Sequence, residues 1–231
     1  MRERPLLLNS DMVRAVLNGS KTQTRRIMTP QPADDIHRHV FPNRDVQGWL
    51  SSLKHKHGPT TAHICPFGAV GDRLWVRETW SDVNLEGTSA VAYRADGGLR
   101  GLTNDNDDGD EDDPRLEKYS FANWYPDLIS GAEGIWRPSI HMPRWASRIT
   151  LDITGVRVER MYDISEDDAR AEGVEQLRGG FWRHYQPGWT QHQLSARGSF
   201  VTLWKSIYGD ESWQANPWVW VIEFKRVEVD A

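Results

Sequence analysis

The residues of this chain best suited to chemistry are a lysine, a threonine and a glutamate: Lys21, Thr24 and Glu78. A threonine hydroxyl is a poor nucleophile near neutral pH and needs a neighbouring base. A lysine can be that base only where burial lowers its pKa enough to leave a free amine. A glutamate could orient the lysine or protonate a departing amine. Brought together, these three residue types would supply a nucleophile, its base and an acid or orienting group.

Lys21 and Thr24 lie between two expected elements. Apolar residues at helical spacing predict a helix over residues 10–17, with Gly19 as a left-handed stop. Residues 21–27 are polar and rich in threonine, which favours a strand leaving that turn. If the whole segment were one regular strand, Lys21 and Thr24 would face opposite sides. The scheme therefore requires Lys21 to lie in the turn, with regular alternation starting later.

Glu78 falls in a segment, residues 73–80, whose alternation predicts a strand. Leu74, Val76 and Glu78 share one face of it, so the carboxylate should point inward with the apolar residues. A buried carboxylate is costly unless it is paired with a cation or hydrogen-bonded, or has a functional role. Judged on the residues alone, a structural ion pair between Lys21 and Glu78 is the simpler interpretation.

Short strands and helices without a repeating rhythm follow along the chain. We expect strands near residues 5–8, 91–94, 149–158 and 218–227, helices over 164–171 and 200–209, and insertions at about 29–68, 97–135 and 177–198. Alternation slips by one residue after Gly155, which indicates a bulge. No βαβ rhythm, internal repeat or dinucleotide-binding glycine pattern occurs in the sequence. The pattern predicts an α+β barrel with insertions.

Three blocks of this sequence resemble a known family. Residues 19–26 are similar to the ASCH signature, in which a glycine, a lysine two positions on, a polar or acidic residue and an arginine mark the cleft; Gly19, Lys21, Thr24 and Arg26 match that spacing. Residues 71–80 and 136–148 resemble members found in phage and prophage genomes. The resemblance touches most of the chain and leaves out mainly the His-rich and Asp-rich loops.

The resemblance implies a fold and a reaction. ASCH proteins are PUA-like β-barrels, so it implies a single PUA-like (ASCH) domain over residues 1–231, with short flanking helices and long loop insertions. Some small bacterial members are amidohydrolases that remove the acetyl group from N4-acetylcytidine with a lysine, a threonine and a glutamate. Those roles carry over to Lys21, Thr24 and Glu78. We therefore expect a hydrolase acting on an N-acylated nucleoside or base.

Further residues are expected to bind the substrate. Arg26 or Arg77 could hold negative charge that develops on oxygen, and Trp75 or Trp80 could stack on the base. Two other functions stay open. One is a noncatalytic module that binds RNA or a modified base. The other is a ribonuclease, an activity reported for another ASCH member, in which Lys21 and Arg26 would steady the phosphate.

Composition limits the cellular setting and the partners. The net charge of −5 argues against a nonspecific duplex binder, although much of the acidity lies between Asp105 and Asp113. The single cysteine, Cys65, excludes an intramolecular disulfide and fits a reducing compartment. The sequence shows no signal-peptide or membrane-spanning pattern. We expect a cytoplasmic protein with a nucleoside or single-stranded RNA ligand, no membrane association and no obligate protein partner.

Two segments invite a metal-site interpretation that their spacing does not support. The histidines near Cys65 have the wrong spacing for a zinc finger, and no Cys-x-x-Cys occurs; they are His37, His39, His55, His57 and His63. The Asp-rich run fails as a calcium loop, because with Gly109 at the glycine position the terminal glutamate position falls on Arg115. We expect no metal and no cofactor.

Overall fold

The computed structural model describes residues 1–40, 47–54, 58–85, 88–102, 122 and 125–227. The strands are β1 (Glu3–Leu7), β2 (Gln23–Ile27), β3 (His37–Val40), β4 (Gln47–Ser51), β5 (Thr61–His63), β6 (Arg73–Arg77), β7 (Trp80–Leu85), β8 (Thr88–Tyr93), β9 (Leu99–Gly101), β10 (Thr150–Arg160) and β11 (Trp218–Arg226). The α-helices are α1 (Ser10–Leu17), α2 (Tyr125–Ser130), α3 (Glu166–Ala171), α4 (Ala196–Tyr208) and α5 (Asp210–Gln214). The Asp-rich run, His55 and His57 lie outside the described residues.

The strands form three sheets, with the orders β1-β6-β10-β11-β2, β3-β4-β5 and β7-β8-β9. Sheets and short helices occur together without a βαβ repeat, so the α+β class expected from the sequence is confirmed. Over the described strands, the five-stranded sheet has an open order that begins with β1 and ends with β2. The closed PUA-like barrel stays a prediction.

The chain divides into two compact units. Unit 1 consists of Met1–Arg4, Ala15–Leu74 and Leu151–Ala231, and unit 2 consists of Pro5–Arg14 and Trp75–Thr150. The limits between the units fall inside β1, α1 and β6 and at the start of β10.

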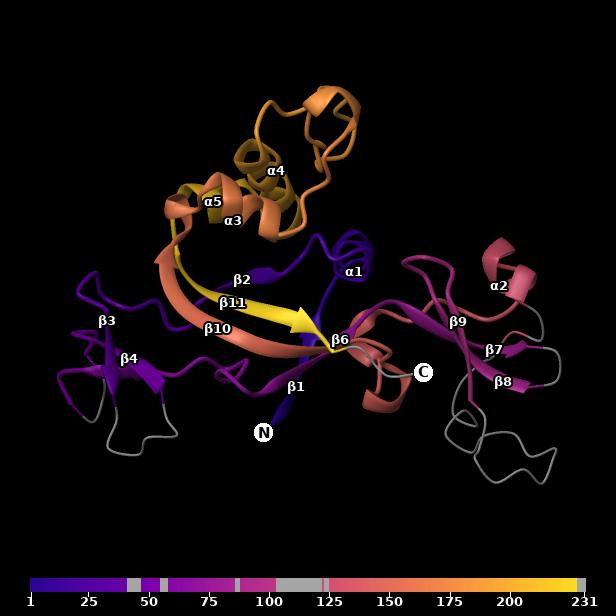
Figure 1. Ribbon diagram of the computed structural model, residues 1–231, viewed down its shortest axis with the longest axis horizontal. Helices are drawn as coiled ribbons and strands as arrows, with labels where there is room; N and C mark the ends of the chain where they lie inside the picture. Colours follow the sequence, from indigo (N-terminus) through magenta and orange to yellow (C-terminus); the bar gives the residue numbers. More distant parts are fainter. Residues whose placement is uncertain (41–46, 55–57, 86–87, 103–121, 123–124, 228–231) are drawn as a thin grey trace. The chain divides into compact units, whose positions relative to one another are not determined.

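Strands β10 and β11 are the longest in unit 1 and run antiparallel (Figure 1). Their register shifts between Ile153 and Gly155, which confirms the bulge predicted at Gly155. A Cβ atom at position 155 would lie 2.4 Å from Oε2 of Glu223 on β11, so a larger residue there would displace the end of this side chain. Strand β2 pairs with the other edge of β11.

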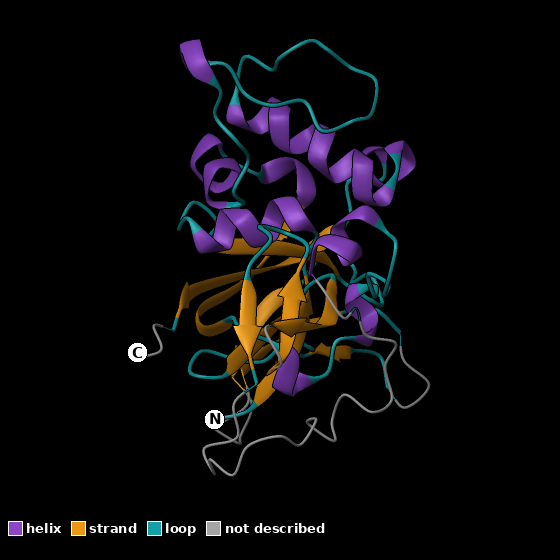
Figure 2. Cartoon of the chain, turned by 90° about the vertical axis from the view of Figure 1, so that its right-hand side faces the viewer, coloured by secondary structure: helices purple, strands orange, loops and turns teal. Residues whose placement is uncertain are grey.

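A layer of helices covers this sheet in unit 1. Helices α3, α4 and α5 lie together on one side of β2 and β11, as Figures 1 and 2 show. The predicted start of α3 is confirmed, because Ser165 and Asp168 form a reciprocal capping box. The periodicity of the chain places Trp204, Trp218 and Trp220 on core faces; Trp204 and Trp220 are buried, whereas Trp218 is half-buried.

Residues 29–68, expected to be an excursion or long loop, include an antiparallel sheet of β3, β4 and β5. Its strands are only three to five residues long, too short for alternation to stand out among histidines, prolines and glycines. Trp49 of β4 packs edge-on against Trp220, with ring centroids 5.0 Å apart. In the same sheet, the buried Ser51 Oγ of β4 and His63 Nε2 of β5 are joined by a 2.9 Å hydrogen bond.

Unit 2 is built around the β7-β8-β9 meander. Two buried apolar clusters support it, one of Trp80, Val91, Tyr93, Met142 and Ala146, the other of Val83, Ala90, Ala92, Ala122 and Leu128. The strand predicted over residues 73–80 ends at Arg77, and a new strand begins at Trp80. Glu78 therefore lies in the short link between β6 and β7. No described helix is long and apolar enough to cross a membrane.

Candidate functional site

Lys21 lies in the turn that the chemical scheme requires. Gly19 has a positive φ of 81°, and Lys21 N–H then donates to the carbonyl of Ala15 at 2.9 Å, closing the turn after α1. Lys21 forms an isolated antiparallel bridge with Glu172, whereas β2 begins only at Gln23. Lys21 thus precedes the regular strand that carries Thr24.

The Lys21 side chain is fully buried and bonds to Glu172 twice. Its Nζ donates to Oε2 of Glu172 at 2.9 Å and to the Glu172 carbonyl at 2.8 Å. Burial lowers the pKa of Lys21, and the attraction of Glu172 opposes that shift. Arg25 shares the same carboxylate, since its NH1 donates to Oε1 of Glu172 at 3.2 Å. One glutamate therefore balances two buried cations.

Gly173 makes this close approach possible. A Cβ atom there would lie 2.7 Å from the Cβ atoms of both Ala15 and Lys21. Its φ of 82° also suits glycine best. The turn after α3 and the turn after α1 can meet only because position 173 has no side chain.

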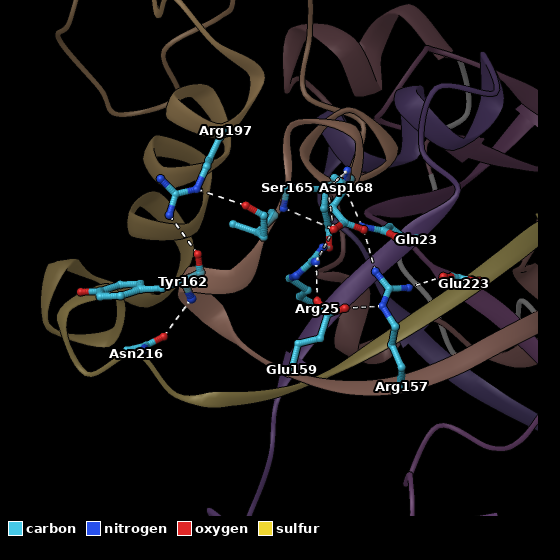
Figure 3. A network of polar contacts seen from close by, with 12 residues as sticks. Gln23, Arg25, Arg157, Glu159, Tyr162, Ser165, Asp168, Arg197, Asn216 and Glu223 are labelled. Atoms are coloured by element: carbon cyan, nitrogen blue, oxygen red, sulfur yellow. Dashed lines mark hydrogen bonds and ion pairs between the residues drawn. The ribbon is translucent and has the colours of Figure 1, made fainter. Parts of the chain in front are cut away.

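Arg25 extends the network along the sheet (Figure 3). Its NH2 lies 2.9 Å from Oε2 of Glu159 and 3.4 Å from Oδ2 of Asp168. Arg157 bonds the same two carboxylates and also Glu223. Burial disfavours the charged form of Asp168, but the Ser165 hydrogen bond and the charge of Arg25 outweigh it and lower its pKa to about 2. We call Lys21, Arg25, Arg157, Glu159, Asp168, Glu172 and Glu223 the ion network.

Thr24 is buried beside this network but is not part of it. It sits in β2 opposite Ile222, between Gln23 and Arg25, whose side chains both reach Asp168. Because successive strand side chains alternate, Thr24 points to the other face of the sheet. It is 1% exposed, and within the described structure its Oγ1 has no hydrogen-bond partner. Lys21 and Thr24 are thus three positions apart but not hydrogen-bonded.

Glu78, in unit 2, is bonded to an arginine. Arg148 grips its carboxylate with two 2.9 Å hydrogen bonds, from Nε and NH2. The same guanidinium bonds Asp96 and stacks 4.0 Å from the ring centroid of Tyr93. Burial raises the pKa of Glu78, while Arg148 opposes that rise. The charge of Glu78 is balanced inside unit 2.

Among the expected binding residues of unit 2, Trp75 and Trp80 differ in accessibility. Trp75 is half-buried and has the guanidinium carbons of Arg77 and Arg144 at 5.5 and 5.9 Å from its ring centroid. Trp80 is fully buried, with the Arg137 guanidinium 5.0 Å from its ring centroid. Only Trp75 presents an exposed part of its ring in this conformation.

Arg26 follows Arg25 in β2, in unit 1, and is half-buried. Its NH1 donates to the hydroxyl of Tyr208, at the end of α4, at 3.2 Å. This contact ties the guanidinium to the end of α4.

The main partners of the predicted residues were not identified from the sequence. Glu172 lies 151 positions from Lys21, and Arg148 lies 70 positions from Glu78. Ser165, followed three residues on by Asp168, is a local sequence signal for the start of α3. Nothing in the sequence around Glu172 marks it as the counter-ion of a lysine.

Within the described residues, no group of three or more His, Cys, Asp or Glu side chains is placed to hold a metal ion. Comparisons with protein-family models, with curated proteins and with solved structures found no match to this chain.

Proposed function

We propose that this protein is a hydrolase that removes the acyl group from an N-acylated nucleoside or base, such as N4-acetylcytidine, with Thr24 as the nucleophile. The observation that supports this most is the buried Thr24 hydroxyl, which has no hydrogen-bond partner among the residues that the structure describes. Leaving a buried polar group unpaired costs about 1–3 kcal/mol. Such a cost is expected where the group has another role, and nucleophilic attack is one.

Lys21 is the base in this proposal. Burial favours its neutral amine, and Glu172, at 2.9 Å, can accept the proton that the ammonium loses. The proposal requires the amine to leave Glu172 and reach the Thr24 hydroxyl, which the alternation of β2 places on the other face of the sheet. The amine then takes the hydroxyl proton as oxygen attacks the acyl carbon. Protonation of the exocyclic nitrogen of the nucleobase then breaks the C–N bond to the acyl group. Water hydrolyses the acyl-Thr24 ester to free acid and threonine.

The ASCH resemblance gives Glu78, in unit 2, the protonation of the departing amine, and that role stays a prediction. Burial of Glu78 favours the protonated acid that this step needs. The paired hydrogen bonds from Arg148 favour the carboxylate instead. Glu78→Gln therefore separates an acid role from a structural one.

The test is release of carboxylic acid from N4-acylated cytidines, offered as nucleosides and within RNA oligomers. We expect Thr24→Val to lose at least about 100-fold in turnover while Thr24→Ser keeps measurable activity. Thr22→Val, on an exposed threonine two positions away, is the matched control and should stay within about twofold of the wild type. Turnover that survives Thr24→Val, or no acid release from any substrate, contradicts the proposal. Strand cleavage that needs the 2′-hydroxyl would support a ribonuclease instead.

A noncatalytic base-binding module is the second candidate, and Trp75 favours it. Two guanidinium groups lie over its ring, and the buried Nε of Arg77 has no hydrogen-bond partner within the described structure. An aromatic ring beside arginines suits a base with its phosphate. Under this function Trp75→Ala weakens binding of the same oligomers, whereas Thr24→Val leaves it unchanged. Trp136→Ala is the control, since Arg94 lies over that half-buried ring in the same unit.

A further inference from the structure

Residues 176–209 of unit 1 differ in charge from the rest of the chain. The segment contains Arg178, Arg183, Arg197 and Lys205 and has no aspartate or glutamate, although the whole protein carries a net charge of −5. It also contains the residues that were expected to form only an irregular insertion. A cationic segment on an acidic chain is a candidate contact for a polyanion.

This segment has a defined backbone. Trp182 is buried and forms bridges with both Gln176 and Gln193. Trp182 and Gln193 exchange two main-chain hydrogen bonds, of 2.9 and 2.8 Å. In Figure 1 this orange segment lies beyond α4, on the side of the helical layer away from β11. The two bridges and their main-chain hydrogen bonds therefore hold the backbone of this segment in place.

Two pairs of aromatic rings lie in this segment. His184 and Trp189 stack with centroids 5.2 Å apart and planes within 13°, and Phe181 lies 6.0 Å from His192. Trp189 is 58% exposed and Phe181 is 43% exposed. Large apolar rings left in water on an ordered segment mark an interaction site. Each pair offers a supported ring with an open side.

The positive charges of residues 176–209 are only partly balanced. Lys205 of α4 pairs with Asp210 at 3.1 Å. Arg178 is exposed, and within the described structure it has no ion pair or hydrogen bond. Arg183 pairs with Glu175. The Arg197 guanidinium donates to the carbonyls of Ile164 and Tyr162 (Figure 3).

Carboxylates from neighbouring segments also approach the surface. Glu175 is used by Arg183, and Glu166 of α3 accepts the main-chain N–H groups of Ala196 and Arg197. Both therefore have donors already. The unmatched charge of Arg178 is available to a ligand.

We propose that Arg178, Phe181, His184, Trp189 and His192, here called the loop surface, bind single-stranded nucleic acid. Bases stack on the open sides of Trp189 and Phe181, and Arg178 contacts the phosphates. Stacked aromatic rings beside cations are the usual means of holding unpaired strands, whereas a duplex hides its base faces and favours a broad basic area. The net charge of −5 on this chain argues against the duplex. The inference goes beyond the proposed hydrolysis and does not depend on it.

Fluorescence anisotropy of labelled 12-nucleotide oligo(U) and oligo(dT) with the full chain tests this. We expect Trp189→Ala and Phe181→Ala each to weaken binding about fivefold or more, the loss of one stacked base. Tyr162→Ala is the matched control, because this ring is 39% exposed and packs on Trp213 outside the loop surface. Thr24→Val should bind as the wild type does, which separates this inference from the hydrolysis proposal.

Salt dependence tests the phosphate contact. For single strands, each phosphate contact contributes about 0.7 to the slope of log K against log salt. Arg178→Ala should reduce the slope by about that amount, and Lys225→Ala, an exposed cation on β11, should leave it unchanged. Equal losses in the Tyr162 and Trp189 variants, tighter binding of a 12-base-pair duplex, or no binding at low salt would overturn the inference.

Discussion

Lys21 and Glu172 hold each other through both side chain and main chain. The lysine Nζ bonds to the Glu172 carboxylate and to its carbonyl, and the two residues also form a β-bridge. A buried ammonium needs such a partner, because moving an unpaired charge out of water is very costly. The pair ties the turn after α1 to the end of α3, and it keeps the candidate base in contact with a proton acceptor.

Glu172→Gln should destabilise the protein by about 3–5 kcal/mol near neutral pH, the usual cost of removing one partner from a buried ion pair. The variant leaves Lys21 and Arg25 without their shared charge. Urea unfolding measures the change. Glu175→Gln, in the exposed pair with Arg183, should cost less than about 1 kcal/mol. Similar losses of unfolding free energy in both variants would show that the buried ion pair stabilises the fold no more than the exposed pair does.

Thr24→Val should separate stability from activity. The substitution replaces an unpartnered buried hydroxyl with a methyl group of similar size, so the free energy of unfolding should stay level or rise by about 1 kcal/mol. Hydrolysis should be lost in the same variant. Thermal unfolding and acid release, measured on one preparation, check both. A clear loss of stability would reveal a hydrogen bond that the hydroxyl makes.

The buried Ser51–His63 pair predicts a pH dependence of folding. Burial lowers the pKa of His63 below its ordinary value of 6.5, so below pH 6.5 the unfolded chain binds the proton more readily than the folded one. Stability from this group is present above pH 6.5 and falls as the pH drops. His63→Gln should weaken this dependence in urea midpoints between pH 5 and 7, whereas His141→Gln, on an exposed histidine, should retain it. An unchanged profile in the His63 variant would contradict this assignment.

Asp168 predicts a second pH window, further into acid. Its pKa in the folded protein is about 2, below the ordinary value of 3.8, so its contribution is present above pH 4 and is lost as the pH falls towards 2. Asp168→Ala should also cost about 1 kcal/mol at pH 7 through the lost capping box. Asp167→Ala, at an exposed neighbouring position, should change the free energy of unfolding by no more than about 0.5 kcal/mol, both at pH 7 and in the acid range. Denaturant unfolding from pH 2 to 5 makes the comparison.

Local sequence rules located the elements with strong periodicity or explicit caps. The spacing of Met12, Val13 and Val16 predicted α1, and the slip at Gly155 predicted the bulge in β10. The same rules failed for β3 to β5, because strands this short offer too few residues for a period to be seen. They also extended β6 to Trp80, since alternation continues through the link that contains Glu78.

The site could be predicted only in part for a related reason. The position of Lys21 in its turn followed from Gly19, a local signal. Its partner Glu172 lies far along the chain, and pairing of this kind depends on how the sheet and α3 pack together. The same holds for Arg148 and Glu78. Sequence identifies charged residues that need partners, but tertiary packing selects the partners.

The missing side chain at Gly155 affects a helix that it does not touch. The carboxylate of Glu223 occupies the space where a Cβ atom would stand, and from there it bonds Arg157. Arg157 in turn bonds Asp168, which caps the first turn of α3. A larger residue in the bulge would displace the end of the half-exposed Glu223 side chain and with it the contact to Arg157. The bulge in β10 thus makes room for a carboxylate whose contacts lead, through Arg157, to the cap of α3.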